Sequence, residues 1–192
     1  FCSAAALQEE ELSKVRPLVV DAICRDNAGM DFGSWMQAYQ QHKPDPAGLL
    51  LLCNDSVLGP FWELGEVLGR LLAKPADFYG LVASNEHGWH LQSWFLLFTP
   101  VVHQSDVFKS FMTLQTHHLS KTEIIEQCEL GLSHLLESEG FRGAALYDPR
   151  GRNGKDFYIR QLRDVKLAAV IEDWDSGLLQ QYGRMCAHAL AR

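Results

Sequence analysis

The hydrophobic residues of this chain follow two alternating patterns along its 192 positions. Short stretches rich in aliphatic and aromatic residues predict buried strands. Between them, apolar residues recur at three- and four-residue spacing, which predicts helices with one buried face. This alternation indicates the α/β class. The strands are expected at residues 19–24, 48–53, 77–83, 91–98 and 141–147, and the helices are expected to begin near Gln8, Met30, Pro60, Gln104, Lys121 and Asp175.

The stretch 48–53 is a continuous apolar run that ends abruptly at Asn54, Asp55 and Ser56. A strand without alternation is typical of a mainly parallel sheet that is covered on both faces. Side chains at the carboxyl end of a central strand face the crevice in which open α/β sheets bind ligands. Asp55 would then offer an oxygen ligand to Mg²⁺ or Mn²⁺, since such ions use one or two carboxylates together with substrate phosphates. Alternatively, the triplet only forms a turn.

A second polar cluster, Arg25 to Asp31, lies between an expected strand and a helix. In that helix Phe32, Trp35, Met36 and Tyr39 share one face by their spacing. The backbone amides at the start of the helix therefore point toward the ends of the strands. The pairing of this cluster with the polar triplet favours a ligand site over a simple turn.

The helix expected over 121–139 begins with a capping box at Ser120 and carries one acidic residue close to its apolar stripe. At about 100° per residue, Glu129 lies roughly 40° from the centre of the stripe. A carboxylate near a buried face loses solvation unless a cation or amide donors compensate for it. Glu129 is therefore either a functional group or one half of an ion pair with an arginine such as Arg25 or Arg142. The stripe consists of Ile125, Cys128, Leu132, Leu135 and Leu136.

Two polar residues lie within the strand expected at 91–98 or at its start. His90 and Gln92 alternate with Leu91 and Ser93, so their side chains fall on the same face. They would either contact a sugar or an acceptor, or form a solvated or hydrogen-bonded face of an edge strand.

Composition limits the classes of function. With 47% hydrophobic and 21% charged residues, residues 1–192 fit one soluble globular domain. The formal net charge of -7 argues against nucleic-acid binding, which needs a cationic surface. Five widely spaced cysteines are expected to be small buried residues in a reducing, cytoplasmic compartment. The longest nearly apolar stretch, 94–102, is far shorter than the roughly 20 residues of a membrane-spanning helix, and the chain starts without a secretory signal pattern.

Five ordered motifs carry a resemblance to a known family. They read RDNAGMDFGSW, LLLLCNDSVLGPF, DFYGLVAS, HLQSWFLLF and CELGLSHLLESEGF, and they extend from about Cys24 to Phe141. In these motifs the sequence resembles the rhamnan synthesis protein F family, whose members are implicated in building rhamnose-rich bacterial cell-surface polysaccharides. The order of an N-x-G loop, a helix, an apolar strand and an acidic triplet is also that of nucleotide-sugar glycosyltransferases of the GT-A type.

The resemblance implies a GT-A-like, Rossmann-type three-layer sandwich with a mostly parallel central sheet. In GT-A enzymes, an earlier strand and helix that help to hold the nucleotide base precede the strand matched here by 19–24. The chain is expected to lack this first strand and helix, and to be a fragment of a longer protein.

The activity implied by the resemblance is transfer of a sugar, such as rhamnose or another deoxyhexose, with inversion at the anomeric carbon. The donor would be a nucleoside diphosphate sugar such as dTDP-rhamnose, and the acceptor a glycan or a lipid-linked glycan. Glu129 falls at the position of the catalytic base, and Asp55 would hold Mg²⁺ or Mn²⁺. The nucleotide-sugar pocket would be formed by Arg25, Asn27, Gly29, Asp31, Asn54 and Asp55.

Two other functions share parts of this pattern. A sugar-nucleotide pyrophosphorylase should show a glycine-rich, basic phosphate loop after its first strand, and that strand is outside this chain. A non-catalytic nucleotide-sugar- or carbohydrate-binding domain would keep the aromatic residues without needing both Asp55 and Glu129. The expected helix after Asp175 would pack on the domain with its apolar face, or would touch the inner face of the cytoplasmic membrane.

Overall fold

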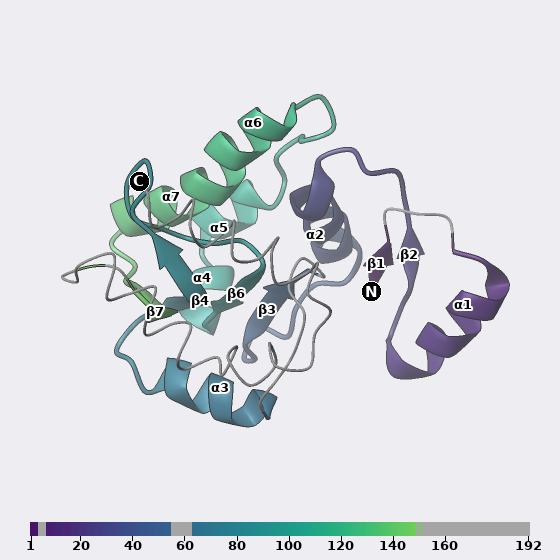
Figure 1. Ribbon diagram of the computed structural model, residues 1–192, viewed down its shortest axis with the longest axis horizontal. Coiled ribbons are helices and arrows are strands. Elements are labelled where there is room, and N and C mark those ends of the chain that lie inside the picture. Colours follow the sequence, from purple (N-terminus) through teal and green to yellow (C-terminus); the bar gives the residue numbers. More distant parts are fainter. Residues whose placement is uncertain (4–6, 55–62, 149, 151–192) are drawn as a thin grey trace, which may run out of the picture. The chain divides into compact units, whose positions relative to one another are not determined.

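The computed structural model describes residues 1–3, 7–54, 63–148 and 150 (Figure 1). The chain divides into two compact units, Phe1–Leu146 and Tyr147–Arg192. The architecture below is that of the first unit, together with the end of its last strand. Asp55 and the expected helix after Asp175 lie outside the described residues.

The first part of the chain forms a small two-stranded sheet with one helix. Strand β1 (Cys2–Ser3) pairs in parallel with β2 (Ile23–Cys24). Between them lie α1 (Glu9–Val15) and the short 3₁₀ helix η1 (Arg16–Leu18). The helix expected near Gln8 is confirmed, because Gln8 and Glu11 form a capping box at its start. The expected strand at 19–24 is shorter than predicted, since its first residues are largely exposed and pair with no other strand in the described residues.

The main sheet has five strands. Strand β6 lies between β3 and β4, and both pairings are antiparallel, with Leu96 opposite Leu52 on one side and opposite Gly80 on the other. Strand β5 also pairs antiparallel with β4, and β7 pairs with β4 as well. The strands are β3 (Leu50–Cys53), β4 (Phe78–Ser84), β5 (His90–Leu91), β6 (Phe95–Phe98) and β7 (Gly143–Tyr147).

The mixed α/β class is confirmed, but the prediction of a mostly parallel central sheet is wrong for the strands β3 to β6. Each pairing among them is antiparallel, and β3, which was expected to be central, pairs only with β6 among the described residues. For β4 and β5 the reason is their connection, which is a short turn, whereas parallel neighbours need a longer crossover. Apolar runs without alternation show that both faces are covered, and they say nothing about strand direction.

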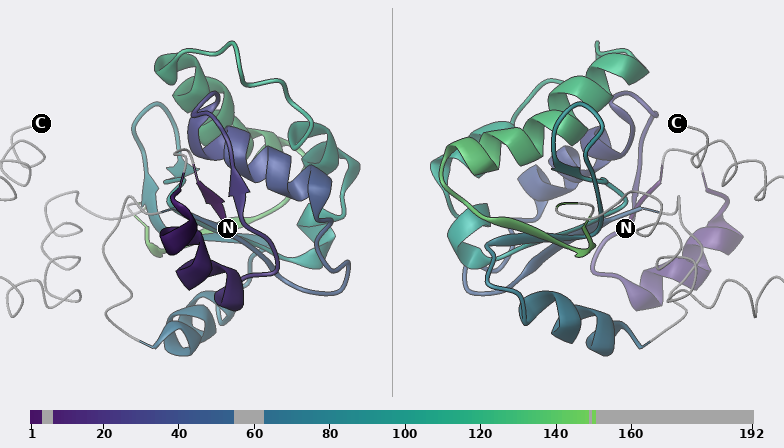
Figure 2. Two further views of the ribbon diagram at one scale, coloured as in Figure 1. Left: turned by 90° about the vertical axis from the view of Figure 1, so that its right-hand side faces the viewer. Right: turned by 60° about the vertical axis from the view of Figure 1, so that its left-hand side comes forward.

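Helices cover both faces of this sheet, and Figure 2 shows α3 on one face and α2, α5 and the helix at 121–138 on the other. Alternating side chains of β6 supply the two cores: Leu96 and Phe98 belong to the larger cluster, whereas Phe95 and Leu97 belong to the cluster next to α3. The helices are α2 (Met30–Gln41), α3 (Leu64–Leu72), α4 (Pro100–His103), α5 (Asp106–Phe111), α6 (Lys121–Ile124) and α7 (Gly131–Ser138), with the π-helical turn η2 (Ile125–Leu130) between the last two.

The expected helix at 121–139 is thus present but contains a π-helical turn that was not predicted. Its most buried apolar residues, Ile124, Cys128, Leu132 and Leu136, recur at a spacing of four. In a regular α-helix this spacing would drift by about 40° at each step. The wider π turn reduces that drift and keeps the stripe facing the core. For this reason Ile125, which the prediction put in the stripe, is 41% exposed.

The cysteines differ from the expectation of uniform burial. Cys128 is fully buried, and burial raises the pKa of its thiol to about 11. Cys24 and Cys53 are exposed, because each ends a strand at the rim of its sheet. None of the helices formed by the described residues has the length and hydrophobicity of a membrane-spanning segment.

Candidate functional site

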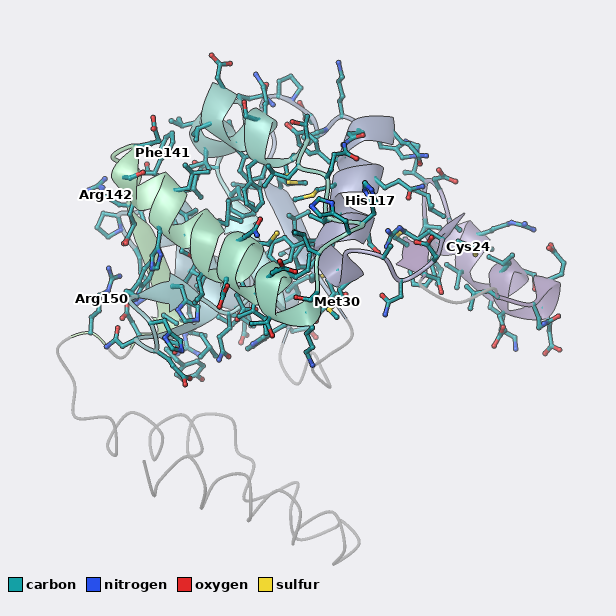
Figure 3. All side chains as sticks on the ribbon, turned by 90° about the horizontal axis from the view of Figure 1, so that it is seen from above. Cys24, Met30, His117, Phe141, Arg142 and Arg150 are labelled. Carbon is teal, nitrogen blue, oxygen red and sulfur yellow. The ribbon has the colours of Figure 1, made fainter. Side chains whose placement is uncertain are left out.

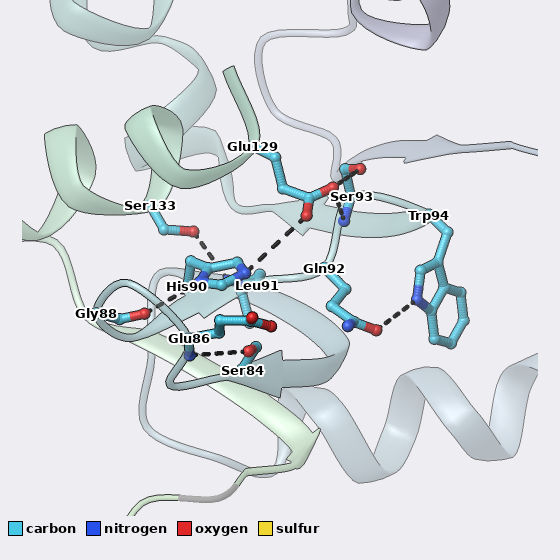
Figure 4. A network of polar contacts seen from close by, with 10 residues as sticks. All are labelled: Ser84, Glu86, Gly88, His90, Leu91, Gln92, Ser93, Trp94, Glu129 and Ser133. Carbon is cyan, nitrogen blue, oxygen red and sulfur yellow. Dashed lines mark hydrogen bonds and ion pairs between the residues drawn. The ribbon is translucent and has the colours of Figure 1, made fainter. Parts of the chain in front are cut away.

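Glu129 lies on the π-helical turn η2 and faces the hairpin formed by β4, β5 and β6 (Figure 4). Its Oε2 accepts a hydrogen bond from the Ser93 hydroxyl and a longer one, 3.4 Å, from the Ser93 backbone N–H. Its Oε1 lies 4.0 Å from Nε2 of His90. The Glu129 side chain is 25% exposed, so the carboxylate lies at the boundary between protein and solvent. The bonds from Ser93 compensate for lost solvation and fix the direction of the carboxylate.

Ser93 can reach Glu129 because the hairpin is irregular at this point. The backbone N–H of Gln92 donates to Val82, whereas Leu96 lies opposite Gly80. The chain therefore advances four positions, 92 to 96, where its partner strand advances two, 82 to 80. Ser93 thus lies in a bulge between β5 and β6. Bulges re-aim side chains and are frequent beside active sites.

The helix and the hairpin are joined at a second point, one turn farther along the helix. The buried hydroxyl of Ser133 accepts a 3.0 Å hydrogen bond from the backbone N–H of Leu91. Next to it, Gly88 packs so closely on His134 that a Cβ at position 88 would lie 2.9 Å from the ring. The position of Glu129 opposite the bulge therefore does not depend on a single hydrogen bond.

His90 is buried, with 4% of its surface exposed, and its Nδ1 lies 3.0 Å from the carbonyl oxygen of Gly88. Because a carbonyl oxygen only accepts, Nδ1 carries a hydrogen and Nε2 is the nitrogen that faces Glu129. Gln92, predicted to share this face, is partly exposed and accepts a 3.2 Å hydrogen bond from the Trp94 indole. His90 is therefore turned toward the carboxylate, and Gln92 keeps surface that a ligand can reach.

At the other end of the site, Asp31 in the first turn of α2 accepts a 2.7 Å hydrogen bond from the side-chain amide of Asn54. The backbone N–H of Asn54, just after β3, donates to the carbonyl of Trp94 at 3.3 Å. Trp94 follows Ser93 in the bulge. A continuous series of contacts therefore leads from Asp31 to Glu129, and the structure brings the two predicted polar clusters together at Asp31 and Asn54.

The loop from Cys24 to Met30, whose two end residues are labelled in Figure 3, holds an unusual backbone conformation. Gly29 and Met30 both have positive φ, 74° and 51°, and the carbonyl of Asn27 accepts a 3.1 Å hydrogen bond from Met30. A Cβ at Gly29 would lie 2.2 Å from the Thr116 hydroxyl. Only glycine fits this position, so the turn that leads into α2 is fixed by backbone geometry.

Arg25 stabilises that loop from inside. Its guanidinium donates to the carbonyl of Ala28, to the Ser34 hydroxyl at 3.2 Å and to Gln37 at 3.2 Å, and its side chain is 12% exposed. In the described residues, Arg25 and Arg142 form ion pairs with Asp26 and Asp77, not with Glu129. These contacts therefore do not support the alternative in which Glu129 forms an ion pair with Arg25 or Arg142.

The described residues do not by themselves form a metal site. No group of three or more His, Cys, Asp or Glu side chains suited to a metal ion occurs in the part of the chain that the structure describes. His117 and His118 are exposed neighbours with ring centroids 5.2 Å apart. Because Asp55 lies outside the described residues, its role as a metal ligand stays a prediction.

Sequence reasoning missed Ser93, Ser133 and the π-helical turn. The spacing of four between Cys128, Leu132 and Leu136 was a signal for the turn, because a regular helix does not keep such a stripe on one face. The bulge had no local signal, since it arises from the register of β4 against β6. Ser93 and Ser133 look like ordinary polar residues until the hairpin and the helix are packed together.

Comparison with known proteins agrees with the motifs. The family model described as rhamnan synthesis protein F matches residues 1–171. The virulence protein VirA of Vibrio anguillarum is 27% identical over 147 residues, which cover 73% of this chain and 46% of that protein. The protein y4gN of Sinorhizobium fredii is 26% identical over 163 residues, which cover 80% of this chain and 42% of that protein. The chain thus spans less than half the length of these curated relatives. No solved structure matches it.

Proposed function

Because this chain belongs to the rhamnan synthesis protein F family, we propose that it helps to build a cell-surface polysaccharide as an inverting glycosyltransferase. It would transfer rhamnose or another deoxyhexose from a nucleoside diphosphate sugar, such as dTDP-rhamnose, to a glycan or lipid-linked glycan. The observation that carries the proposal is the carboxylate of Glu129, held by Ser93 at a strand bulge and linked through Trp94 and Asn54 to Asp31.

In this proposal Glu129 is the general base. Both hydrogen bonds from Ser93 go to Oε2, so Oε1 is the oxygen that accepts the proton of the acceptor hydroxyl. As the acceptor oxygen bonds to the anomeric carbon, the bond from that carbon to the diphosphate breaks and the diphosphate leaves. Such base assistance contributes typically about 10²–10⁴-fold. Alignment of donor and acceptor in one site adds up to roughly 7–11 kcal/mol.

The nucleotide-sugar donor would bind at the other end of the site. The backbone of Asn27 and Gly29 lies at the turn that opens α2, where N–H groups suit an anionic ligand. Asp31 and Asn54 would add polar contacts, and Arg25 would act through the loop that its guanidinium stabilises.

A divalent ion fits the chemistry of this end of the sheet. Asn54, the residue before Asp55, and Asp31, which its side chain contacts, carry hard oxygen atoms, and Mg²⁺ or Mn²⁺ uses such oxygens together with substrate phosphates. When bound beside Asp55, the ion would stabilise the developing charge of the diphosphate as a Lewis acid. Gln92 would contact the sugar or the acceptor, and His90 would lie behind Glu129.

The reaction would take place in the cytoplasm or at the inner face of the cytoplasmic membrane, where activated sugars and lipid-linked acceptors meet. The name of the Vibrio relative, a virulence protein, is compatible with a product exposed on a bacterial surface. A binding domain without catalysis would keep the donor site but would not need a fixed base at Glu129.

Calorimetry and a transfer assay on the full-length protein test the proposal. We expect dTDP-rhamnose to bind in the presence of Mn²⁺, Asp55→Ala to abolish that binding, and Glu129→Gln to retain it while losing transfer. Binding without transfer to any glycan or lipid-linked acceptor would favour the binding domain. Absence of binding to every nucleoside diphosphate sugar would contradict both functions.

A further inference from the structure

The two oxygens of Glu129 have different surroundings. Oε2 accepts both the hydroxyl and the backbone N–H of Ser93. Oε1 faces Nε2 of His90 at 4.0 Å. This distance is too long for a hydrogen bond, but hydrogen bonds of catalytic groups often shorten when the substrate binds. Oε1, which accepts no hydrogen bond from Ser93, is therefore the oxygen that lies beside His90.

The hydrogen bonds of His90 define which of its nitrogens can accept a proton. Nδ1 donates to the carbonyl of Gly88, so in the neutral ring Nε2 has no hydrogen and directs its lone pair toward Oε1. The ring is buried, with 4% of its surface exposed. The other titratable groups around it, Glu86 and His87 in the turn and His134 on α7, are exposed.

We propose that His90 is a positioning residue that takes over the proton which Glu129 removes from the acceptor. The inference rests on the proposed function. The acceptor O–H bond breaks as its oxygen bonds to the anomeric carbon, and the diphosphate leaves with the electron pair of the broken C–O bond. The proton first binds Oε1 of Glu129. It then moves to Nε2 of His90, which leaves a carboxylate beside an imidazolium.

The relay explains why a buried histidine lies behind a carboxylate that is itself partly exposed. A protonated Glu129 would have to lose its proton to solvent before the next cycle. Transfer to Nε2 restores the carboxylate, and the imidazolium then loses its proton to solvent, directly or back through Glu129, before the next cycle. The Gly88 carbonyl holds the ring in the required tautomer, as second partners of functional histidines generally do.

Nitrogen NMR of the ¹⁵N-histidine-labelled full-length protein, without substrate, tests the tautomer. We expect His90 to carry its proton on Nδ1 and to show an unprotonated Nε2, whose signal shifts in Glu129→Gln. A proton on Nε2 of the free protein, alone or with one on Nδ1, would overturn the relay, because Nε2 could then accept nothing. This measurement does not depend on turnover, so it stands even if no sugar is transferred.

Kinetics test whether the relay operates. His90→Gln removes the titratable nitrogen, and we expect kcat to fall about 10–100-fold with KM unchanged, as for other partners of catalytic groups. His118→Gln, the same change at an exposed histidine that is not part of the site, is the control and should match the parent. An unchanged kcat in His90→Gln would overturn the proposal, as would a change confined to KM, which indicates substrate contact. An inactive parent protein would instead contradict the proposed function.

Discussion

The two ends of the candidate site are held in different ways. Around Glu129 the contacts are made by side chains between segments distant in sequence, and Ser93 and Ser133 join the hairpin to the helix. Around Asp31 the geometry is set by the backbone, with positive φ at Gly29 and Met30. The first arrangement fixes the direction of one carboxylate, and the second fixes a row of backbone groups at a helix start. This difference matches a division between proton removal at one end and donor binding at the other.

The largest expected effect is the loss of sugar transfer when Glu129 is replaced. Glu129→Gln keeps the shape and the hydrogen bond from the Ser93 hydroxyl but cannot accept a proton. We expect transfer to fall about 10²–10⁴-fold while the dissociation constant of the donor stays unchanged. If Glu129→Gln also weakened donor binding, proton removal and donor binding would not be divided between the two ends of the site.

Gly29→Ala should distort the turn before Asp31 and lower the stability of the protein. The new Cβ would lie 2.2 Å from the Thr116 hydroxyl, on a residue with φ of 74°. We expect a loss of stability of about 2–4 kcal/mol, since strain at positive φ costs about 1–3 kcal/mol before any clash. Thermal and denaturant unfolding measure it.

Gly140→Ala is the matched control, because Gly140 also has positive φ, 89°, but a Cβ there meets nothing within 4 Å. It should cost about 1 kcal/mol. Equal losses of stability in Gly29→Ala and Gly140→Ala would mean that Thr116 leaves room for a Cβ at position 29.

Ser93→Ala should loosen the Glu129 end without removing the base. It deletes the hydroxyl bond but keeps the backbone N–H bond of 3.4 Å. We expect about 1–2 kcal/mol lower stability and about tenfold lower kcat. Ser84→Ala, at the end of β4, also deletes a hydroxyl that accepts a hydrogen bond, here from the backbone N–H of Glu86, so it should lower stability by a similar amount but leave kcat unchanged. If Ser93→Ala transfers at the parent rate, Ser93 does not orient the carboxylate.

The smallest effect concerns Cys128, the residue before Glu129 on the buried side of the π turn. Burial raises the pKa of this thiol from 9.0 to about 11. Stability should therefore fall as pH rises from about 9 to about 11, because the unfolded thiol ionises first. At lower pH, thiol reagents should label Cys24 and Cys53 well before Cys128. Fast labelling of Cys128 in folded protein would show that the π turn opens readily.

The parts of the site that could be predicted from sequence are those encoded locally. The helix face from Phe32 to Met36 and the polar residues at Asp31 and Asn54 follow from spacing and from the abrupt end of an apolar run. Glu129 was singled out because it is an acidic residue close to an apolar stripe and because of the resemblance to inverting GT-A enzymes. In contrast, the antiparallel sheet and the partners Ser93 and His90 depend on how β4 pairs with β6 and how the helix packs on the hairpin, and no local pattern records those contacts.

A crystal structure of the full-length protein with dTDP and Mn²⁺ would show whether the two ends of the site face the same ligand. We expect the diphosphate beside Asp31, Asn54 and Asp55, with Oε1 of Glu129 facing the bound nucleotide from the opposite side. This expectation would be contradicted by a nucleotide bound elsewhere, or by Glu129 turned away from the bound diphosphate with both oxygens engaged by the protein.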